Sequence, residues 1–188
     1  VEADDVIHHQ QYAGCGFGRR LEPDAAIPAA LASQFINRPV KLIFTREDDM
    51  MFNFNRTLTY QVLEGGAEFG KITSLKHDNC AGWSTFRQAP GFMADSKDNK
   101  GKLDQFSTNG SDHWYDIPNH YVRSIRNEMN DKSNPPGSVR SVAPFWSFFA
   151  VESYMDEMAH LMKIDPLEFR LRHINPVGIN KGIKGVSY

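Results

Sequence analysis

The chain is poor in cysteine, with only Cys15 and Cys80 among its 188 residues and no Cys-x-x-Cys pair. Two thiols cannot by themselves hold an iron–sulfur cluster or a structural zinc ion, because both need about four ligands. Cys15 also falls inside a glycine-rich loop, where a disulfide would obstruct ligand binding. We therefore expect two free thiols, and any redox metal must come with a cofactor or a partner protein.

An excess of charge of one sign is also missing, since 21 basic and 23 acidic residues leave a formal net charge of −2. That balance predicts neither a nucleic-acid-binding surface nor a disordered acidic tail. No apolar run approaches the roughly 20 residues that a membrane-spanning helix needs. The first residues, VEADD, contain neither an initiator methionine nor the basic start of an export signal, so we expect the sequence to begin inside a longer chain.

The first quarter of the chain is predicted to alternate strand and helix around a glycine-rich run, GCGFGRR at 14–20. Residues up to about Tyr12 are compatible with a strand, and VKLIFT at 40–45 combines the β-branched and aromatic residues of a buried strand. Between them a helix is expected at about 23–36, with Asp24 as its N-cap. The expected order is strand, glycine loop, helix, strand.

The middle of the chain and its C-terminal part contain clearer patterns. Two alternating runs at 56–82 predict a β-hairpin with glycines in its turn, and a short strand is expected at about 121–128. After the breaker NPPG, helical spacing predicts a helix at about 147–163, and an Asp-Pro pair opens a last helix at 165–173. The stripe expected to face the core on the longer helix consists of Phe148, Val151, Met155, Met158 and Leu161.

These elements predict an α/β to α+β fold in which helices pack on mixed sheets. Thirteen phenylalanines indicate a substantial core, contact with another chain, or both. We expect two regions, 1–134 with the glycine loop and hairpin and 135–188 with a second loop and two helices. The two regions are expected to form one continuous structural unit.

Three glycines at alternate positions, 14, 16 and 18, leave backbone amides free to approach an oxygen-rich ligand. A dinucleotide site of the Rossmann type fits poorly, because the pattern is not GxGxxG and no acidic residue follows about 20 residues later. A P-loop is excluded because no Gly-Lys-Ser or Gly-Lys-Thr follows. On its own, the run is equally compatible with a tight turn that binds nothing.

Five segments in a fixed order carry more information than the glycine run alone. They are GCGFGRR, PVKLIFTREDDM, YDIPN, PPGSVRSVAPF and FFAVESYMDEMAHLMKIDPLEFRLRHI. This series resembles the large, molybdopterin-binding subunit of the molybdenum hydroxylases, the xanthine oxidase family. It is most similar there to aldehyde dehydrogenases and isoquinoline oxidoreductases, over nearly the whole chain from Gly14 to about Asn175.

The resemblance implies that two loops lie on either side of a molybdenum centre. Backbone amides of the glycine loop would face the metal, with Phe17 as a wall, although Cys15 departs from the commoner all-glycine run. Arg19 and Arg20 either contact the pterin phosphate or form ion pairs with Asp24 and Glu22. In the second loop, 137–145, Arg140 matches the arginine of the corresponding family segment. The implied cofactor-binding residues are Gly14, Gly16, Phe17, Gly18, Arg19, Arg140, Ser141, Val142 and Ala143.

The resemblance also implies an activity, the hydroxylation of an aldehyde or an N-heteroaromatic substrate with water as the oxygen source. The cofactor would be molybdopterin with molybdenum, in its cytosine dinucleotide form. Electrons would pass to [2Fe-2S] clusters on a small subunit and then to the haem of a cytochrome c subunit, on the periplasmic face of the inner membrane. The remainder of the large subunit would be the first partner, and no nucleic acid is implied.

No catalytic residue is named, because the family's glutamate base lies near the C-terminus of a longer chain and has no counterpart here. The segment alone is therefore expected to be inactive. Two alternatives stay open: an NAD-dependent oxidoreductase domain that uses the same glycine loop, and a non-catalytic assembly subunit. Among other polar groups, 47–49 is expected to start a helix rather than bind magnesium, and His8 and His9 diverge too far to share a metal.

Overall fold

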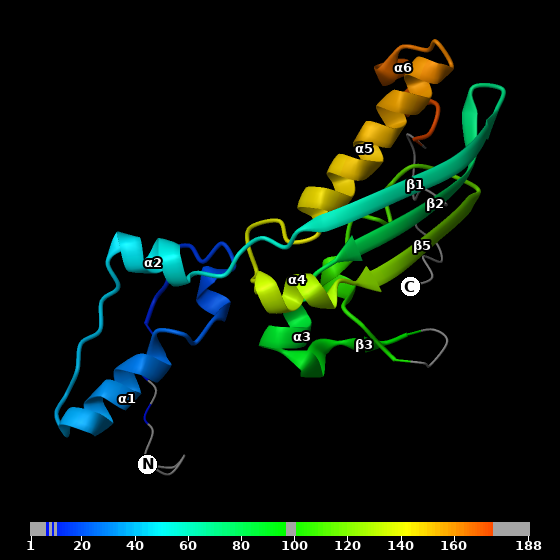
Figure 1. The fold of residues 1–188 in the computed structure, drawn as a ribbon. Helices are drawn as coiled ribbons and strands as arrows, with labels where there is room; N and C mark the ends of the chain where they lie inside the picture. The colour runs from blue at the N-terminus through cyan, green and yellow to red at the C-terminus, as the bar shows by residue number, and fades with distance from the viewer. Residues whose placement is uncertain (1–6, 8, 10, 97–100, 175–188) are drawn as a thin grey trace.

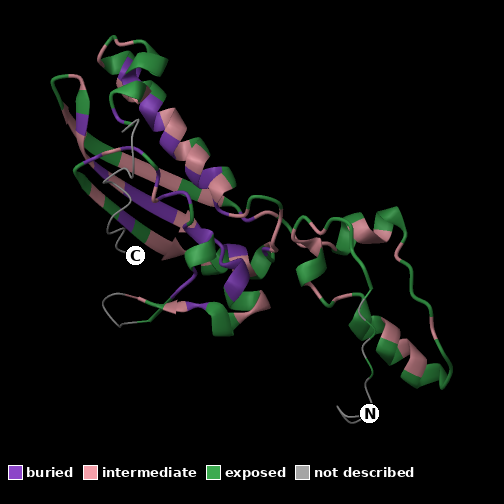
Figure 2. Ribbon diagram, turned by 180° about the vertical axis from the view of Figure 1, so that it is seen from behind, coloured by how far each residue is buried: buried purple, intermediate pink, exposed green. Residues whose placement is uncertain are grey.

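The computed structural model describes residues 7, 9, 11–96 and 101–174, and it divides visibly into a body and an arm (Figure 1). The arm, residues 11–53, carries α1 (Ala26–Ile36) and α2 (Arg46–Phe52) away from the rest of the molecule. Neither helix contains a buried residue, whereas the buried residues gather in the body (Figure 2). The body therefore holds the hydrophobic core, and the arm is an open extension.

The body is built on a three-stranded sheet in the order β1-β2-β5. The hairpin predicted from the alternating pattern is confirmed, since β1 (Thr59–Glu68) and β2 (Lys71–Ala81) pair antiparallel around a turn with Phe69 and Gly70 at positive φ. The strand expected near 121–128 is also present as β5 (Asn119–Arg126), which pairs parallel with β2. One antiparallel and one parallel pair make a mixed sheet, in agreement with the predicted fold class.

Two helices cover the sheet at the C-terminal end of the described chain. The long helix α5 (Pro144–Leu161) begins earlier than expected, because Pro144 can occupy its first turn without losing a hydrogen bond. The last helix, α6 (Pro166–Leu171), follows the predicted Asp-Pro start, with the Asp165 carboxylate accepting from the amides of Leu167 and Glu168. The shorter elements are α3 (Ser84–Gln88), α4 (Glu128–Ser133), β3 (Ala94–Asp95), β4 (Lys102–Leu103) and the 3-10 turns Arg19–Leu21, Pro90–Phe92 and Gln105–Ser107.

The main core lies between the sheet and the two C-terminal helices. Its buried members are Ile72, Leu75, Tyr115, Ile117, Val151, Tyr154, Met155, Ala159 and Phe169. Met158 and Met162 pack against it, as their helical spacing predicts. The expectation for Leu161 is wrong, since it is 73% exposed. At 3.6 residues per turn the inward stripe passes from Met158 to Met162, which turns Leu161 outward.

Beside this apolar core, the face of the sheet also buries a polar network. The Asn79 side-chain amide donates to the Ser107 carbonyl at 3.3 Å, the Ser111 hydroxyl at 2.9 Å and the Ser147 hydroxyl at 3.2 Å. It thereby ties β2 to the 107–111 segment and to α5. Because a buried amide costs free energy unless it is hydrogen-bonded, this network helps to fix how these three segments pack.

Three histidines extend the polar region and were not recognised in the sequence. His77 and His113 are 0% and 1% exposed, and the His113 and His120 ring centroids lie 4.3 Å apart. His77 Nε2 is 2.7 Å from the Gln61 side-chain oxygen, whereas one ring nitrogen of each histidine has no hydrogen-bond partner. Burial lowers the pKa of His77 to about 4 and that of His113 to about 3, so both are neutral at pH 7.

Of the two strands expected in the first quarter, the one at 40–45 is wrong. Residues 11–13 and 40–45 form no strand, and the earlier part of the first expected strand lies largely outside the described residues. Ile43 is 71% exposed, and no neighbouring strand of the described chain pairs with this segment. Strand propensity alone does not form a strand without a partner and a face to bury. The strand, glycine loop, helix, strand unit is therefore absent from the described chain, although α1 lies within the range predicted for its helix.

Candidate cofactor site

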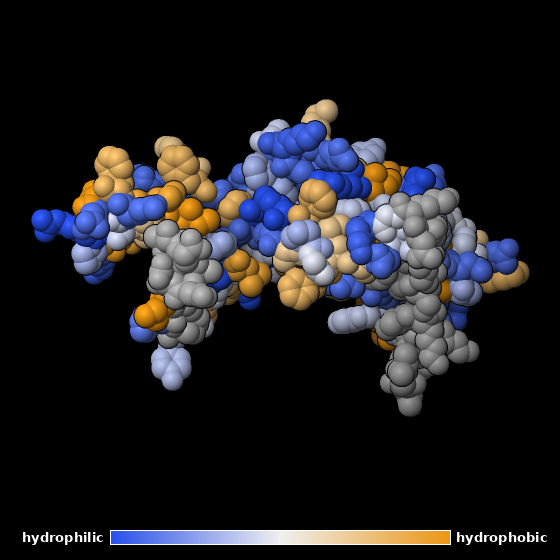
Figure 3. All heavy atoms as spheres, turned by 90° about the horizontal axis from the view of Figure 1, so that it is seen from below, coloured by the Kyte–Doolittle hydropathy of each residue, from blue (hydrophilic) through white to orange (hydrophobic). Residues whose placement is uncertain are grey.

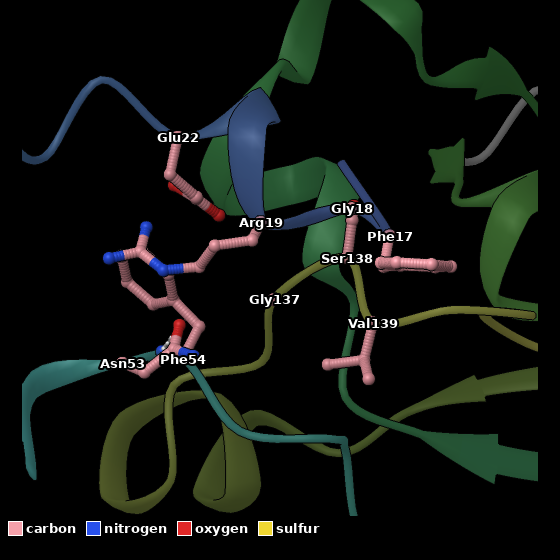
Figure 4. A pocket seen from close by; sticks show the side chains of 9 residues that line it. All are labelled: Phe17, Gly18, Arg19, Glu22, Asn53, Phe54, Gly137, Ser138 and Val139. Carbon is pink, nitrogen blue, oxygen red and sulfur yellow. Dashed lines mark hydrogen bonds between the residues drawn. The ribbon is translucent and has the colours of Figure 1, made fainter. Parts of the chain in front are cut away.

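The two loops singled out in the sequence, 14–18 and 137–143, meet in space. Gly18 packs so closely on Ser138 that a Cβ at position 18 would overlap the Ser138 carbonyl oxygen. Gly18 also has a φ of 90°, which disfavours any other residue. Figure 4 shows the two residues in direct apposition. The two bends are thus on the same side of the molecule, as a shared ligand would require.

A small cavity of about 210 Å³ opens at this junction. Its lining residues are Phe17, Gly18, Arg19, Glu22, Asn53, Phe54, Gly137, Ser138 and Val139. In Figure 4 the Phe17 and Val139 side chains lie on one side of the Gly18–Ser138 contact, and those of Arg19, Glu22 and Phe54 lie on the other. Ligand pockets usually measure about 300–1,000 Å³, so this cavity alone is smaller than such a pocket.

Both loops contain non-glycine residues in the left-handed backbone region. Phe17 has a φ of 48°, Ser141 of 76° and Val142 of 42°. Such conformations cost about 1–3 kcal/mol each, and they concentrate at ligand sites, where neighbouring contacts hold them. Val142 is the most unusual of the three, because a β-branched side chain tolerates positive φ poorly. This strain on both sides of one junction points to a ligand site.

The structure brings some of the predicted site residues together and leaves others aside. Phe17 is 58% exposed, and the Arg140 guanidinium lies 5.4 Å from the centroid of its ring. Ala143, by contrast, is fully buried beside Ala81 and Trp146, and Gly14 has open space around it. The cavity is lined by 137–139 rather than 141–143, so the ligand roles of Ser141, Val142 and Ala143 stay predictions.

Arg19 adopts the ion-pair alternative that the sequence left open. Its guanidinium binds both carboxylate oxygens of Asp24, at 2.7 and 2.8 Å, and reaches Asp49 at 3.2 Å. The hydrogen bonds from Arg19 hold the pKa of the Asp24 carboxyl below its usual value. The expectation that Asp24 is the N-cap of α1 is wrong, because Ala25 occupies that position. Arg20 does not pair with Glu22; its Nε instead donates to the Cys15 carbonyl at 2.9 Å.

An arginine that no sequence pattern indicates joins the arm to the start of the second loop. Arg87 donates to the Pro136 carbonyl at 3.0 Å and to the Glu22 carboxylate at 2.5 Å, and its guanidinium stacks 3.7 Å from the centroid of the Phe54 ring. Gln88 also donates to Glu22. The Glu22 side chain is only 5% exposed, so these donors compensate an otherwise costly buried charge. Nothing in the local sequence around Arg87 identifies this role.

Protein side chains in the described part of the chain do not form a metal centre. No group of three or more His, Cys, Asp or Glu residues there is placed to hold a metal ion, although His8 lies outside that part. The Thr45 side chain and Asp48 form a reciprocal capping box, which confirms 47–49 as a helix start. Cys15 and Cys80 are free thiols, as expected. Within the described residues, no helix has the length and apolar character to cross a membrane.

The junction nevertheless fits a metal that arrives already bound to an organic cofactor. Gly18 lets the two backbones approach more closely than any side chain would allow, and Arg140 places a cation beside the exposed Phe17. An anionic pterin phosphate is attracted by such a cation, and backbone amides can contact an oxo-metal group without ligating it. The residues present therefore suit a molybdopterin.

Comparison with known proteins agrees with this chemistry. A family model described as the molybdopterin cofactor-binding domain matches residues 1–174. The chain is 42% identical over 184 residues to the membrane-bound aldehyde dehydrogenase (pyrroloquinoline-quinone) of Gluconacetobacter polyoxogenes, over 97% of this chain and 24% of that protein. It is 30% identical over 177 residues to isoquinoline 1-oxidoreductase subunit beta of Brevundimonas diminuta, over 93% of this chain and 22% of that protein.

A solved structure shares the fold. The aldehyde oxidoreductase from Desulfovibrio gigas superimposes with a TM-score of 0.67 at 20% sequence identity, over 90% of this chain and 18% of that one. The chain thus spans about a quarter or less of the length of these relatives. Because the family model covers the two loops and all of the described residues, this chain belongs to the molybdopterin cofactor-binding domain family.

Proposed function

We propose that the chain forms one side of the molybdopterin cradle in an oxidoreductase that hydroxylates aldehydes or N-heteroaromatic compounds with water as the oxygen source. The observation that supports this most directly is the contact between Gly18 and Ser138, which unites the two loops named from the sequence. Region 1–134 supplies the first loop and region 135–188 the second. The molybdenum cofactor, proposed to be the cytosine dinucleotide form, supplies the redox chemistry.

The chain's own residues would bind and orient the cofactor. In this proposal, the backbone of Gly14, Gly16 and Gly18 approaches it from the first loop, and Phe17 excludes water from one side. The exposed Arg140 lies on the ring of Phe17 and can pair with a phosphate. Arg19 contributes indirectly, because its ion pairs with Asp24 and Asp49 fix the base of the first loop.

The arm supports the proposal that this segment works inside a larger subunit. Its exposed apolar residues are Ile27, Leu31, Phe35, Ile36, Leu42, Ile43, Met50, Met51 and Phe52. Figure 3 shows hydrophobic surface gathered over this part of the molecule. Monomeric proteins rarely leave so many large apolar side chains together in water, so we propose that the remainder of the subunit covers the arm.

Further partners follow from the same proposal. A small subunit with [2Fe-2S] clusters would take the electrons, and a cytochrome c subunit would receive them next. The relative from Gluconacetobacter polyoxogenes is named a membrane-bound enzyme, which is consistent with a site of action at the periplasmic face of the inner membrane. A second candidate, a non-catalytic assembly subunit, would share the fold and lack the metal.

Metal analysis of the full-length native protein tests the proposal. About one molybdenum per copy of this domain is expected, together with a pterin released on denaturation. The same extract should be assayed for pyrroloquinoline quinone, which the name of the 42% identical relative gives as its cofactor, and for NAD. Either of these compounds in place of molybdenum, or no cofactor at all, would overturn the proposal.

A further inference from the structure

The second loop contains a turn that needs support from outside itself. Ser141 and Val142 both have positive φ, and within the turn the Val142 amide donates to the Val139 carbonyl at 2.8 Å. Arg140 and Ser141 are exposed, so this side of the loop has little packing of its own. Backbone in such a conformation persists only where surrounding contacts hold it.

Residues 55 and 56 run beside this loop and provide those contacts. The Asn55 amide donates to the Pro135 carbonyl at 3.2 Å, and the Gly137 amide donates to the Asn55 carbonyl at 3.0 Å. Arg56 continues the contact further along the loop, where its Nη2 donates to the Arg140 carbonyl at 2.9 Å across 84 positions of sequence. The backbone of Asn55 therefore fixes the start of the loop, and the side chain of Arg56 reaches its strained turn.

Arg56 also contacts Phe145, three residues after Val142. Its guanidinium carbon lies 4.0 Å from the centroid of the Phe145 ring, in the first turn of α5. Arg56 thus bridges the carbonyl just before Ser141 and Val142 and the aromatic ring just after them. Both contacts are favourable to a cation, since a carbonyl oxygen and a ring face each present negative charge.

Arg56 has no carboxylate partner in the described part of the chain, in contrast to Arg19 and Arg87. None of the ion pairs formed there includes it, and its Nη1 is buried without a hydrogen-bond partner. Partial burial lowers the pKa of the guanidinium. The contacts of the Arg56 guanidinium are therefore with one carbonyl and one aromatic ring, both belonging to the second loop and its junction with α5.

We propose that Arg56 is a positioning residue for the cofactor site: it holds the left-handed turn at Ser141 and Val142 by binding the Arg140 carbonyl and stacking on Phe145. This turn then determines the position of the Arg140 guanidinium relative to the Phe17 ring of the first loop. This inference rests on the proposed function for its link to the cofactor, whereas the hold on the loop itself does not depend on the cofactor.

Hydrogen exchange in the full-length native protein tests the inference, with three variants. Arg56→Met removes the charge and the donor but keeps the apolar stem. Arg56→Lys can still donate to the carbonyl and lie on the ring. Arg172→Met is the matched control, because Arg172, at the end of α6, forms an ion pair with Glu168 at 3.2 Å and with no other residue of the described chain.

The expected result is at least tenfold faster exchange of the Val142 and Phe145 amides, which donate to the Val139 and Val142 carbonyls, in Arg56→Met, with no change at 72–81 in β2. Arg56→Lys should recover most of the protection, and molybdenum content should fall in Arg56→Met only. Unchanged exchange of the Val142 and Phe145 amides, or equal acceleration in the core strand or in Arg172→Met, would overturn the inference. Absence of molybdenum from the unmodified protein would instead count against the proposed function, and the exchange result would still decide the role of Arg56.

Discussion

Replacing Gly18 by alanine is expected to lower the molybdenum content of the full-length protein to less than a tenth of normal. The new methyl group would overlap the Ser138 carbonyl oxygen, and alanine would have to adopt a φ of 90°. The two loops would therefore have to move apart. Residues of both loops could then no longer contact the same ligand. Metal analysis of the purified variant measures the effect directly.

Gly91→Ala is the matched control for this experiment. Gly91 has no heavy atom within 4 Å of an added Cβ and does not have a positive φ, so its substitution should leave the molybdenum content unchanged. Circular dichroism should show that both variants retain the sheet and α5, because the main core lies away from the loop contact. Full molybdenum occupancy in Gly18→Ala would contradict the shared site.

The second large effect expected is a loss of stability in mild acid. His77 has a pKa of about 4 and His113 of about 3 in the folded protein, mainly because burial disfavours the charged form. In the unfolded chain both titrate near 6.5. The unfolded state therefore takes up protons first, and stability declines as the pH falls from about 6.5 towards 4. A shift of this size is worth about 3 kcal/mol for His77 alone.

Urea unfolding at pH 7, 5.5 and 4 measures this dependence, and His113→Asn separates the histidine contribution from that of carboxylates. Asparagine can keep an acceptor for the Tyr115 amide, which donates to His113 Nδ1 at 3.1 Å, but it does not titrate. The variant should lose less stability between pH 7 and 4 than the unmodified protein. His160→Gln, at an exposed position, should behave as the unmodified protein does. A parallel decline in all three proteins would show that the buried histidines are not responsible.

Local sequence patterns correctly predicted the elements that are determined by residues close together in the chain. The hairpin follows from alternation at 56–82, and α6 follows from the Asp165 cap and Pro166. The parallel pairing of β2 with β5 could not be predicted, because local sequence carries no information on which distant strands will pair. Asp78 and Arg123, for example, lie 45 positions apart and are joined by a hydrogen bond. The 40–45 segment was misassigned for a related reason: Leu42 and Ile43 are exposed, and the segment has no strand to pair with in the described chain.

The loops of the site were predictable, because glycine and proline restrict or free the backbone in ways that can be recognised from the sequence. Glycine at 14, 16 and 18 and the PPGSVR run identified two loops, and the structure joins them at Gly18 and Ser138. The residues that hold these loops were not predictable. Arg56, Arg87 and Glu22 look like ordinary surface charges in sequence, and only their tertiary contacts with Arg140, Phe54 and Pro136 reveal a role. The histidine cluster escaped notice for the same reason, since its members come from three separate segments.

Anomalous X-ray scattering at the molybdenum absorption edge, recorded from crystals of the full-length protein, tests the central claim most directly. We predict one strong peak beside the junction of loops 14–18 and 137–143, close to Phe17 and on the side from which Arg140 can reach the cofactor. A molybdenum peak remote from both loops, or beside one of them with the other turned away, would contradict the cofactor site described here.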